Sequence, residues 1–376
     1  MKITAIDIVD LRVPLPSKVT YDGAYVGCLV RVATDAGIEG IAEIDSAPEV
    51  IKALVHGRPS VTWPPLFSLY EGQDPLGDPE ASWDRVYAAT LHAGRRGILV
   101  HALSGIDIAL WDIRGKAAGK SVAALLGTPR RDRVRAYTTL VRLGDTADSV
   151  KRVIDAGLAR GARAIKLCSD ANWRHDRALV ERILRAARDH VGSAVTIMID
   201  AYGVWKSADE VEPHWALFRE IGIEWLEAPL PMDDLDGYAR LSERGIPITG
   251  GDMGLTTRFE FQDMAIRGKV EILQPDMTYV GGITEFRRTA AFAKAHRRRI
   301  IPHGYKSNIL LATNLAFLAQ HDVEEWLEYS IAPSPLRWGM TREEFPIEAD
   351  GRVRVPQGPG LGVTLNEETV AKYRVG

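Results

Sequence analysis

Three short apolar segments decide the fold: VTIMID at residues 195–200, IEWLEAPLP at 223–231 and IPITGGD at 246–252. Each has the composition of a buried β-strand, and each leads to an acid, at Asp200, Glu227 and Asp252. The acids lie 27 residues apart (200 to 227) and then 25 apart (227 to 252), the length of one strand, one loop and one helix. Three successive strands of a parallel sheet therefore deliver three carboxylates to one edge.

These carboxylates predict a site for a hard divalent cation. Carboxylates held close together repel one another unless a cation compensates their charge. Ligation by oxygen alone, with room left for water and substrate, favours Mg²⁺, with Mn²⁺ as the alternative. Any one of the acids could instead cap a helix or pair with a surface arginine, but matched spacing on three strands favours the metal site.

The same strand-and-helix pattern continues on both sides of these segments. Strand-like runs lie at 134–141, 163–168, 195–200, 223–227, 247–250, 271–274, 299–302 and 325–329, with helical patterns between them. Eight strands that alternate with helices predict an α/β fold, the eightfold βα barrel.

Outside this region the pattern differs. Residues 1–45 alternate as antiparallel strands around a polar loop at 14–27, whose length favours a functional role such as a lid. Residues 46–80 carry loop signals, and 83–126 are helical and apolar over wide arcs. From residue 345 the barrel pattern stops, and we expect this tail to form a hairpin and fold back on the N-terminal unit.

Composition limits the class of protein. The 376 residues suit one large barrel with a smaller unit, and 46% hydrophobic with 26% charged residues is typical of a globular protein. A net charge of −3 gives no argument for a nucleic-acid or membrane partner, and no apolar run is long enough to span a bilayer. Two cysteines, Cys28 and Cys168, exclude a disulfide framework and favour the cytoplasm.

The active site of an eightfold barrel lies at the C-terminal ends of its strands. The sixth predicted strand leads to Asp276 and the seventh to His303. A carboxylate beside an imidazole fixes its tautomer and raises its basicity, which prepares a general base. We therefore predict a catalytic pair of Asp276 and His303.

Two more strand ends carry ionisable residues. Lys166, on the second strand, is costly to bury unless it faces an anion, so it could hold a substrate carboxylate or act as a second base. An ion pair with one of the acids in the barrel wall is nearly as good an interpretation. Glu328, on the eighth strand, could donate a hydrogen bond to a substrate carboxylate if it stays protonated, and its rim position favours this over a surface acid.

The series Lys166, Asp200, Glu227, Asp252, Asp276, His303 and Glu328 on strands two to eight resembles the enolase superfamily, mandelate racemase subgroup. The segment SGIDIALWDIRGKAAGKSVAALLG at 104–127 and the pair Gly281-Gly282 also resemble it. The resemblance implies an α+β capping domain of residues 1–125 and the tail 345–376, closing over a catalytic barrel of 126–344 with the loop around 15–27. It also implies that Mg²⁺ binds the substrate carboxylate and stabilises the enediolate formed when a base removes the α-proton. A dimer-based homo-oligomer such as an octamer is implied as well.

The sequence departs from that family in three places. Many relatives have Lys-x-Lys on the second strand, where this chain has Lys166-Leu167-Cys168. The third metal ligand is Asp252 where glutamate is usual, and Tyr202 stands where an asparagine often follows the first ligand. Without a second lysine, proton exchange on both faces of the α-carbon is harder, although Lys166, Cys168 or Tyr202 could replace it. The simplest interpretation is a reaction on one face by His303, the dehydration of an acid sugar to a 2-keto acid.

Two other functions stay open. One is a racemase, epimerase or cycloisomerase on the same scaffold, and the other is a non-catalytic metal-binding relative. The expected partner is a small anionic polyhydroxy acid. Tyrosines could supply hydroxyl contacts to it, although packing explains each of them equally well: Tyr21, Tyr25, Tyr137, Tyr202 and Tyr305.

Overall fold

The computed structural model describes residues 1–15 and 23–375. The predictions for Tyr21 and for most of the loop at 15–27 therefore lie outside the described residues.

The N-terminal domain is built on a three-stranded antiparallel sheet. Its strands β1 (Ile3–Arg12), β2 (Val26–Thr34) and β3 (Glu39–Ile44) pair in that order. The long helix α5 (Ile98–Ala118) packs on β3, and glycines allow the close approach. A Cβ on Gly40 would lie 2.1 Å from the carbonyl oxygen of Ala109, and one on Gly105 would lie 2.5 Å from Ile44 Cγ1.

Shorter helices complete this domain: α1 (Pro48–His56), α2 (Leu66–Tyr70), α3 (Pro79–Ala89), α4 (Leu91–Gly94) and α6 (Val122–Leu126). The prediction that 46–80 is loop is wrong over α1 and α2. Proline is favoured at the first position of a helix, and α1 begins at Pro48 and buries Ile51 and Val55 one turn apart. Nine residues are too few for that periodicity to stand out among the neighbouring loop signals.

The second part is the predicted eightfold barrel. Its strands are β4 (Arg133–Leu140), β5 (Ala164–Cys168), β6 (Thr196–Asp200), β7 (Leu226–Glu227), β8 (Ile248–Gly250), β9 (Ile272–Leu273), β10 (Arg299–Ile300) and β11 (Leu327–Ser330). They form one parallel sheet in the order β10-β9-β8-β7-β6-β5-β4-β11. Between the sheet's two ends, the backbone N–H of Gly304 donates to Glu328 Oε2 at 3.0 Å.

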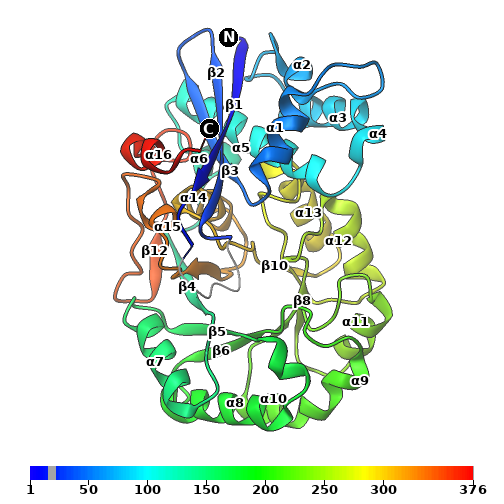
Figure 1. The fold of residues 1–376 in the computed structure, drawn as a ribbon, viewed down its shortest axis with the longest axis vertical. Helices are drawn as coiled ribbons and strands as arrows, with labels where there is room; N and C mark the ends of the chain where they lie inside the picture. The colour runs from blue at the N-terminus through cyan, green and yellow to red at the C-terminus, as the bar shows by residue number, and fades with distance from the viewer. Residues whose placement is uncertain (16–22, 376) are drawn as a thin grey trace.

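Helices join successive strands and cover the outside of the barrel (Figure 1). They are α7 (Ala147–Leu158), α8 (Arg177–Val191), α9 (Ala208–Val211), α10 (Trp215–Ile221), α11 (Leu235–Ser242), α12 (Thr257–Ile266), α13 (Gly282–Ala295), α14 (Asn308–Leu318) and α15 (Pro335–Gly339). A separate apolar cluster fills the barrel: Tyr137, Ala164, Met198, Trp225, Ile272, Ile301 and Trp326. Parallel strands buried on both faces need such continuous apolar runs, which is why the sequence showed them clearly.

The tail links the two parts. Strand β12 (Arg352–Arg354) pairs antiparallel with β4, after which the backbone N–H of Leu361 donates to Asp112 in α5 at 2.8 Å. Helix α16 (Glu367–Tyr373) then brings the chain back to β1, where the N–H of Val375 donates to the carbonyl of Asp10 at 2.9 Å. In Figure 1 both chain ends lie beside the N-terminal sheet.

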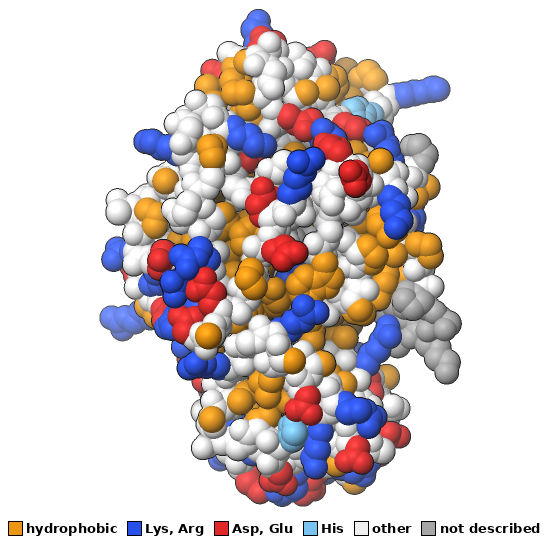
Figure 2. Space-filling view, turned by 90° about the vertical axis from the view of Figure 1, so that its left-hand side faces the viewer, with side chains coloured by type: hydrophobic (Ala, Val, Ile, Leu, Met, Phe, Trp, Pro, Cys, Tyr) orange, Lys and Arg blue, Asp and Glu red, His pale blue; other side chains and the backbone are white. Residues whose placement is uncertain are grey.

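The surface carries charges of both signs. On the face shown in Figure 2, basic and acidic side chains are interspersed around hydrophobic side chains that gather across the middle. Among the described residues, no helix combines the length and apolar character needed to cross a membrane.

Candidate active site

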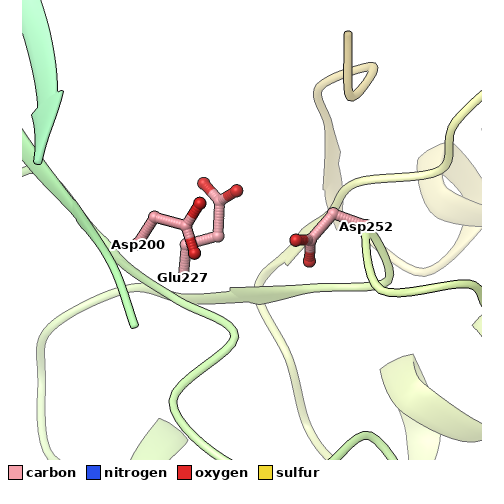
Figure 3. A group of neighbouring side chains, drawn as sticks. All are labelled: Asp200, Glu227 and Asp252. Carbon is pink, nitrogen blue, oxygen red and sulfur yellow. The ribbon is translucent and has the colours of Figure 1, made fainter. Parts of the chain in front are cut away.

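The three acids predicted as metal ligands, Asp200, Glu227 and Asp252, converge at the mouth of the barrel. Asp200 is the last residue of β6, Glu227 is the last residue of β7, and Asp252 lies two residues beyond β8. All three are buried, and one oxygen of each lies within 4.8 Å of the others. Asp200 and Glu227 point up from adjacent strands, and Asp252 faces them from the other side (Figure 3).

Tight turns after the strands fix the orientation of these side chains. Gly251 has φ +114°, and a Cβ there would lie 2.2 Å from the ring of Phe261, so only glycine fits before Asp252. After β6, Tyr202 adopts φ +49° and its backbone N–H donates to Asp200 Oδ1 at 3.0 Å. The local backbone therefore orients two of the three carboxylates.

The chemistry of this triad fits a divalent cation. Asp252 Oδ1 is buried and has no hydrogen-bond partner within residues 1–15 and 23–375. Burial raises the pKa of Glu227 to about 8, with Asp200 and Asp252 adding to the shift and Lys166 opposing it. Burial and the Asp200 carboxylate raise the pKa of Asp252 to about 6. A cation relieves this repulsion, and an all-oxygen donor set suits Mg²⁺.

Lys166 lies against two acids of the triad and is 1% exposed. Its Nζ is 2.5 Å from Glu227 Oε1, 2.9 Å from Glu328 Oε1 and 3.5 Å from Asp200 Oδ2. Burial lowers the pKa of Lys166, but these carboxylates outweigh it and hold that pKa well above its usual value. The structure thus shows the ion pair that the sequence left open, and a substrate contact stays a prediction.

His303 and Asp276 form the predicted pair. His303 Nδ1 lies 2.7 Å from Asp276 Oδ2, and the other oxygen of Asp276 accepts the backbone N–H of Thr278 at 2.6 Å. The other ring nitrogen, Nε2, lies 3.9 Å from Glu328 Oε2. Burial lowers the pKa of His303, but Glu328 and Asp276 outweigh it and raise that pKa to about 10. Asp276 therefore holds the ring so that Nε2 is the nitrogen available for proton transfer.

The expectation of a protonated Glu328 is wrong. Burial raises its pKa, but Lys166 and His303 outweigh burial and lower it to about 2. Its oxygens also accept hydrogen bonds from Thr139 Oγ1 at 2.5 Å and from the N–H of Gly304 at 3.0 Å. Glu328 is thus a fully paired carboxylate beside His303, and it has no proton to donate.

Cys168 stands at the position where the family resemblance implies a second lysine. Its Sγ lies 3.6 Å from Asp200 Oδ2. Burial and the nearby Asp200 raise the pKa of the thiol well above its usual value. Cys168 is therefore a protonated thiol in this setting, which argues against a thiolate base.

The tyrosines predicted to contact the substrate lie in different surroundings. Tyr202 is 58% exposed at the mouth, next to Asp200, and Tyr25 is buried against Ala24 and Ala332. Tyr137 is fully buried in the barrel interior, with its ring centroid 5.5 Å from that of Trp225. The contacts of Tyr25, Tyr137 and Tyr202 with a substrate stay predictions.

Two residues that hold Glu227 were missed. Trp225 Nε1 donates to Glu227 Oε2 at 3.0 Å, and Gln274 Nε2 donates to the same oxygen at 2.7 Å. Alternation along the strand gave a signal for Trp225, which lies two residues before Glu227 and so on the same face. Gln274 lies two strands away, and the sequence held no sign of this contact.

The fold and the site define a βα-barrel protein whose mouth joins a carboxylate triad to a His–Asp pair. Comparison with family models gives the same class. Residues 4–127 match the mandelate racemase/muconate lactonizing enzyme N-terminal domain, and 145–369 match the enolase C-terminal domain-like family. The chain belongs to the mandelate racemase/muconate lactonizing enzyme family of the enolase superfamily.

Characterised relatives are enzymes of sugar acids and their lactones. D-galactarolactone cycloisomerase of Agrobacterium fabrum is 32% identical, covering 100% of this chain and 99% of its own. Arabinonate dehydratase of Saccharolobus solfataricus is 36% identical over 78% of each chain. The solved structure of an enolase-superfamily member from Polaromonas sp. JS666 has a TM-score of 0.87 at 31% identity, covering 100% of this chain and 98% of its own. The chain is therefore an enzyme of this superfamily, and its named relatives include both dehydratases and a cycloisomerase.

Proposed function

We propose that this protein is a Mg²⁺-dependent dehydratase of an acid sugar, forming a 2-keto acid. One observation carries the proposal: His303 is paired with Asp276 through Nδ1, which leaves Nε2 for proton transfer, while the opposite strand offers the protonated thiol of Cys168. A single imidazole suffices for dehydration, whereas racemisation needs a proton carrier on each face.

His303 performs both proton transfers in this scheme. Its Nε2 takes the α-proton, and the resulting imidazolium returns that proton to the departing β-hydroxyl. The C–H and C–O bonds break, water leaves, and the enol product tautomerises to the 2-keto acid. When bound at the triad, Mg²⁺ supplies positive charge that stabilises the negative charge developing on the substrate carboxylate.

The neighbouring residues prepare His303. Asp276 fixes the protonated Nδ1 and so leaves Nε2 as the base. Asp252 also raises the pKa of His303, by less than Glu328 and Asp276 do, so compensating the charge of Asp252 would remove part of that rise. Lys166 lowers the pKa of both Glu227 and Glu328, and we propose that it also faces the substrate carboxylate.

A substrate screen tests the proposal. The protein with Mg²⁺ is incubated with a library of mono- and diacid sugars, and keto acids are detected as semicarbazones. We expect one or a few related acids to give keto acid with the native protein and none with His303→Asn. Turnover by His303→Asn at the native rate would refute the assignment of the base.

Cycloisomerisation is the second candidate, because the D-galactarolactone cycloisomerase matches this chain over its whole length. Reaction in D₂O separates the two. Deuterium incorporation or lactone rearrangement without keto acid would identify a cycloisomerase or epimerase, and keto acid would identify the dehydratase.

A further inference from the structure

Helices α13 and α14 directly follow the turns that carry Asp276 and His303. The N-terminus of a helix leaves backbone N–H groups unpaired and favours a negative charge. The first turn of α13 holds one acid, Glu285, which pairs with Arg258 and Arg288. The first turn of α14 holds no acid, and its own cap is Ser307, whose Oγ accepts the N–H of Ile309 at 3.1 Å. In both cases a carboxylate from the N-terminal domain accepts hydrogen bonds from the start of the helix and supplies the negative charge.

Asp107 of α5 caps α13. Its Oδ2 accepts the backbone N–H of Thr284 at 2.9 Å, and its Oδ1 accepts Thr284 Oγ1 at 2.6 Å. Ser104, one turn earlier on α5, accepts the N–H of Gly281 at 2.8 Å. A Cβ on Gly282 would lie 2.5 Å from Asp107 Oδ2, so the glycine at this position makes room for the carboxylate.

Glu43 of β3 caps α14. Its Oε1 accepts three hydrogen bonds: the N–H of Ser307 at 3.0 Å, Ser307 Oγ at 2.7 Å and the N–H of Leu310 at 2.9 Å. Glu43 is 4% exposed. The turn His303–Ser307 is therefore anchored, at its far end, by the N-terminal sheet.

A second link holds the same turn. Lys306 Nζ pairs with Asp45 Oδ1 at 2.7 Å and donates to the carbonyl of Val26 at 3.0 Å and to that of Gly23. All of these partners belong to the N-terminal domain, and Asp45 lies two residues after Glu43. The proton-moving strands are thus tied to this domain by carboxylates. Among the described residues, the helix after β8 meets the domain differently, since the N–H of Gly97 donates to Thr256 Oγ1 at 3.1 Å.

We propose that Glu43 and Asp107 are positioning residues that set the distance and angle between His303 and Asp276 from outside the barrel. This inference rests on the proposed function only in that His303 moves the proton. A helix whose N-terminal cap is lost can shift its preceding turn, and a misplacement of about 1 Å at a reacting group can lower the rate on the order of 10²-fold.

The test compares Asp107→Asn and Glu43→Gln, which keep shape and remove charge, with Asp112→Asn. Asp112 is the matched control because it lies on the same helix, is equally buried, and accepts the N–H groups of Ile41 and Leu361 instead of a barrel helix. Histidine-selective ¹⁵N labelling reports the tautomer of His303, which is assigned by the signal lost in His303→Asn. This measurement needs no substrate.

We expect the His303 nitrogen shifts to move in Asp107→Asn and Glu43→Gln and to keep native values in Asp112→Asn. With the substrate found by the screen, kcat should fall about 10- to 100-fold in the first two variants with KM little changed. Native His303 shifts in both capping variants, or equal changes in Asp112→Asn, would overturn the inference. If either variant fails to fold by circular dichroism, Thr284→Val and Ser307→Ala each remove one partner of the same carboxylates and serve in its place. A failed dehydratase assay beside altered shifts would count against the proposed function alone.

Discussion

Replacing Lys166 by methionine removes the one ammonium group that the structure places among three buried carboxylates. The side chain is 1% exposed, with Nζ 2.5 Å from Glu227 and 2.9 Å from Glu328. Removing one partner of a buried ion pair costs ~3–5 kcal/mol because the remaining charge stays unpaired. In metal-free buffer, Lys166→Met should therefore lower the free energy of unfolding by this amount.

Added Mg²⁺ should restore part of that loss. A cation at the triad compensates the same carboxylates, and a ligand at a hundredfold excess over Kd stabilises the folded state by about 2.7 kcal/mol. Because Lys166 no longer competes for Glu227, the stabilisation by Mg²⁺ should be larger in the variant than in the native protein. Urea unfolding followed by circular dichroism, with chelator and then with Mg²⁺, measures both quantities.

Lys306→Met is the control. Lys306 is equally a buried lysine, with a side chain 6% exposed, but it pairs with Asp45 outside the triad. The Lys306→Met protein should be less stable than the native protein, but Mg²⁺ should stabilise it no more than it stabilises the native protein. A Lys166→Met protein as stable as the native one in chelator, or one that responds to Mg²⁺ no more than Lys306→Met does, would refute the reasoning.

Three further outcomes follow from the site. Asp276→Asn should lower kcat on the order of 10²- to 10⁴-fold. It should also alter the pH dependence of stability, because the raised pKa of His303 stabilises the native protein fully below pH 6.5 and this contribution is lost as pH rises through about 10. Urea midpoints measured across this range should show that loss at a lower pH in the variant. Glu227→Gln should abolish Mg²⁺ binding in equilibrium dialysis, and undiminished binding by the variant would contradict the triad. In the native protein, the affinity for Mg²⁺ should increase as pH rises through the pKa of Asp252, about 6, and that of Glu227, about 8, because the ligands bind as carboxylates. Cys168→Ser should keep the native kcat, because the thiol is protonated and takes no part in the proposed proton transfer, and a large loss of turnover would instead assign it a role.

The strands and the triad could be predicted because the signals for both lie within short stretches of the sequence. Each barrel strand is an apolar run, and an acid at its end must reach the mouth once the strand is parallel to its neighbours, as Asp200 and Glu227 do. The pair of His303 and Asp276 followed in the same way from adjacent strand ends.

What the sequence could not supply was the pairing of charges in space. The protonated Glu328 was a wrong prediction because the ammonium of Lys166 comes from a strand 162 residues away (166 to 328). The caps on α13 and α14 were missed for the same reason, since Asp107 and Glu43 come from another domain. Tyr137 shows a further limit: it faces the barrel interior, as Thr139 two residues later does, and its depth below the mouth depends on the stagger of the strands, which the sequence does not give.

The return of the tail to β1 also bears on how the chain folds as it is synthesised. Hydrogen bonds join Asp112 to Leu361 and Asp10 to Val375, contacts that span most of the chain. Contacts of such long sequence separation form late, because the intervening loop must close first. The N-terminal sheet emerges from the ribosome early but completes its contacts only after residues 361–375 have followed, so until then α1, α2 and α5 cover it.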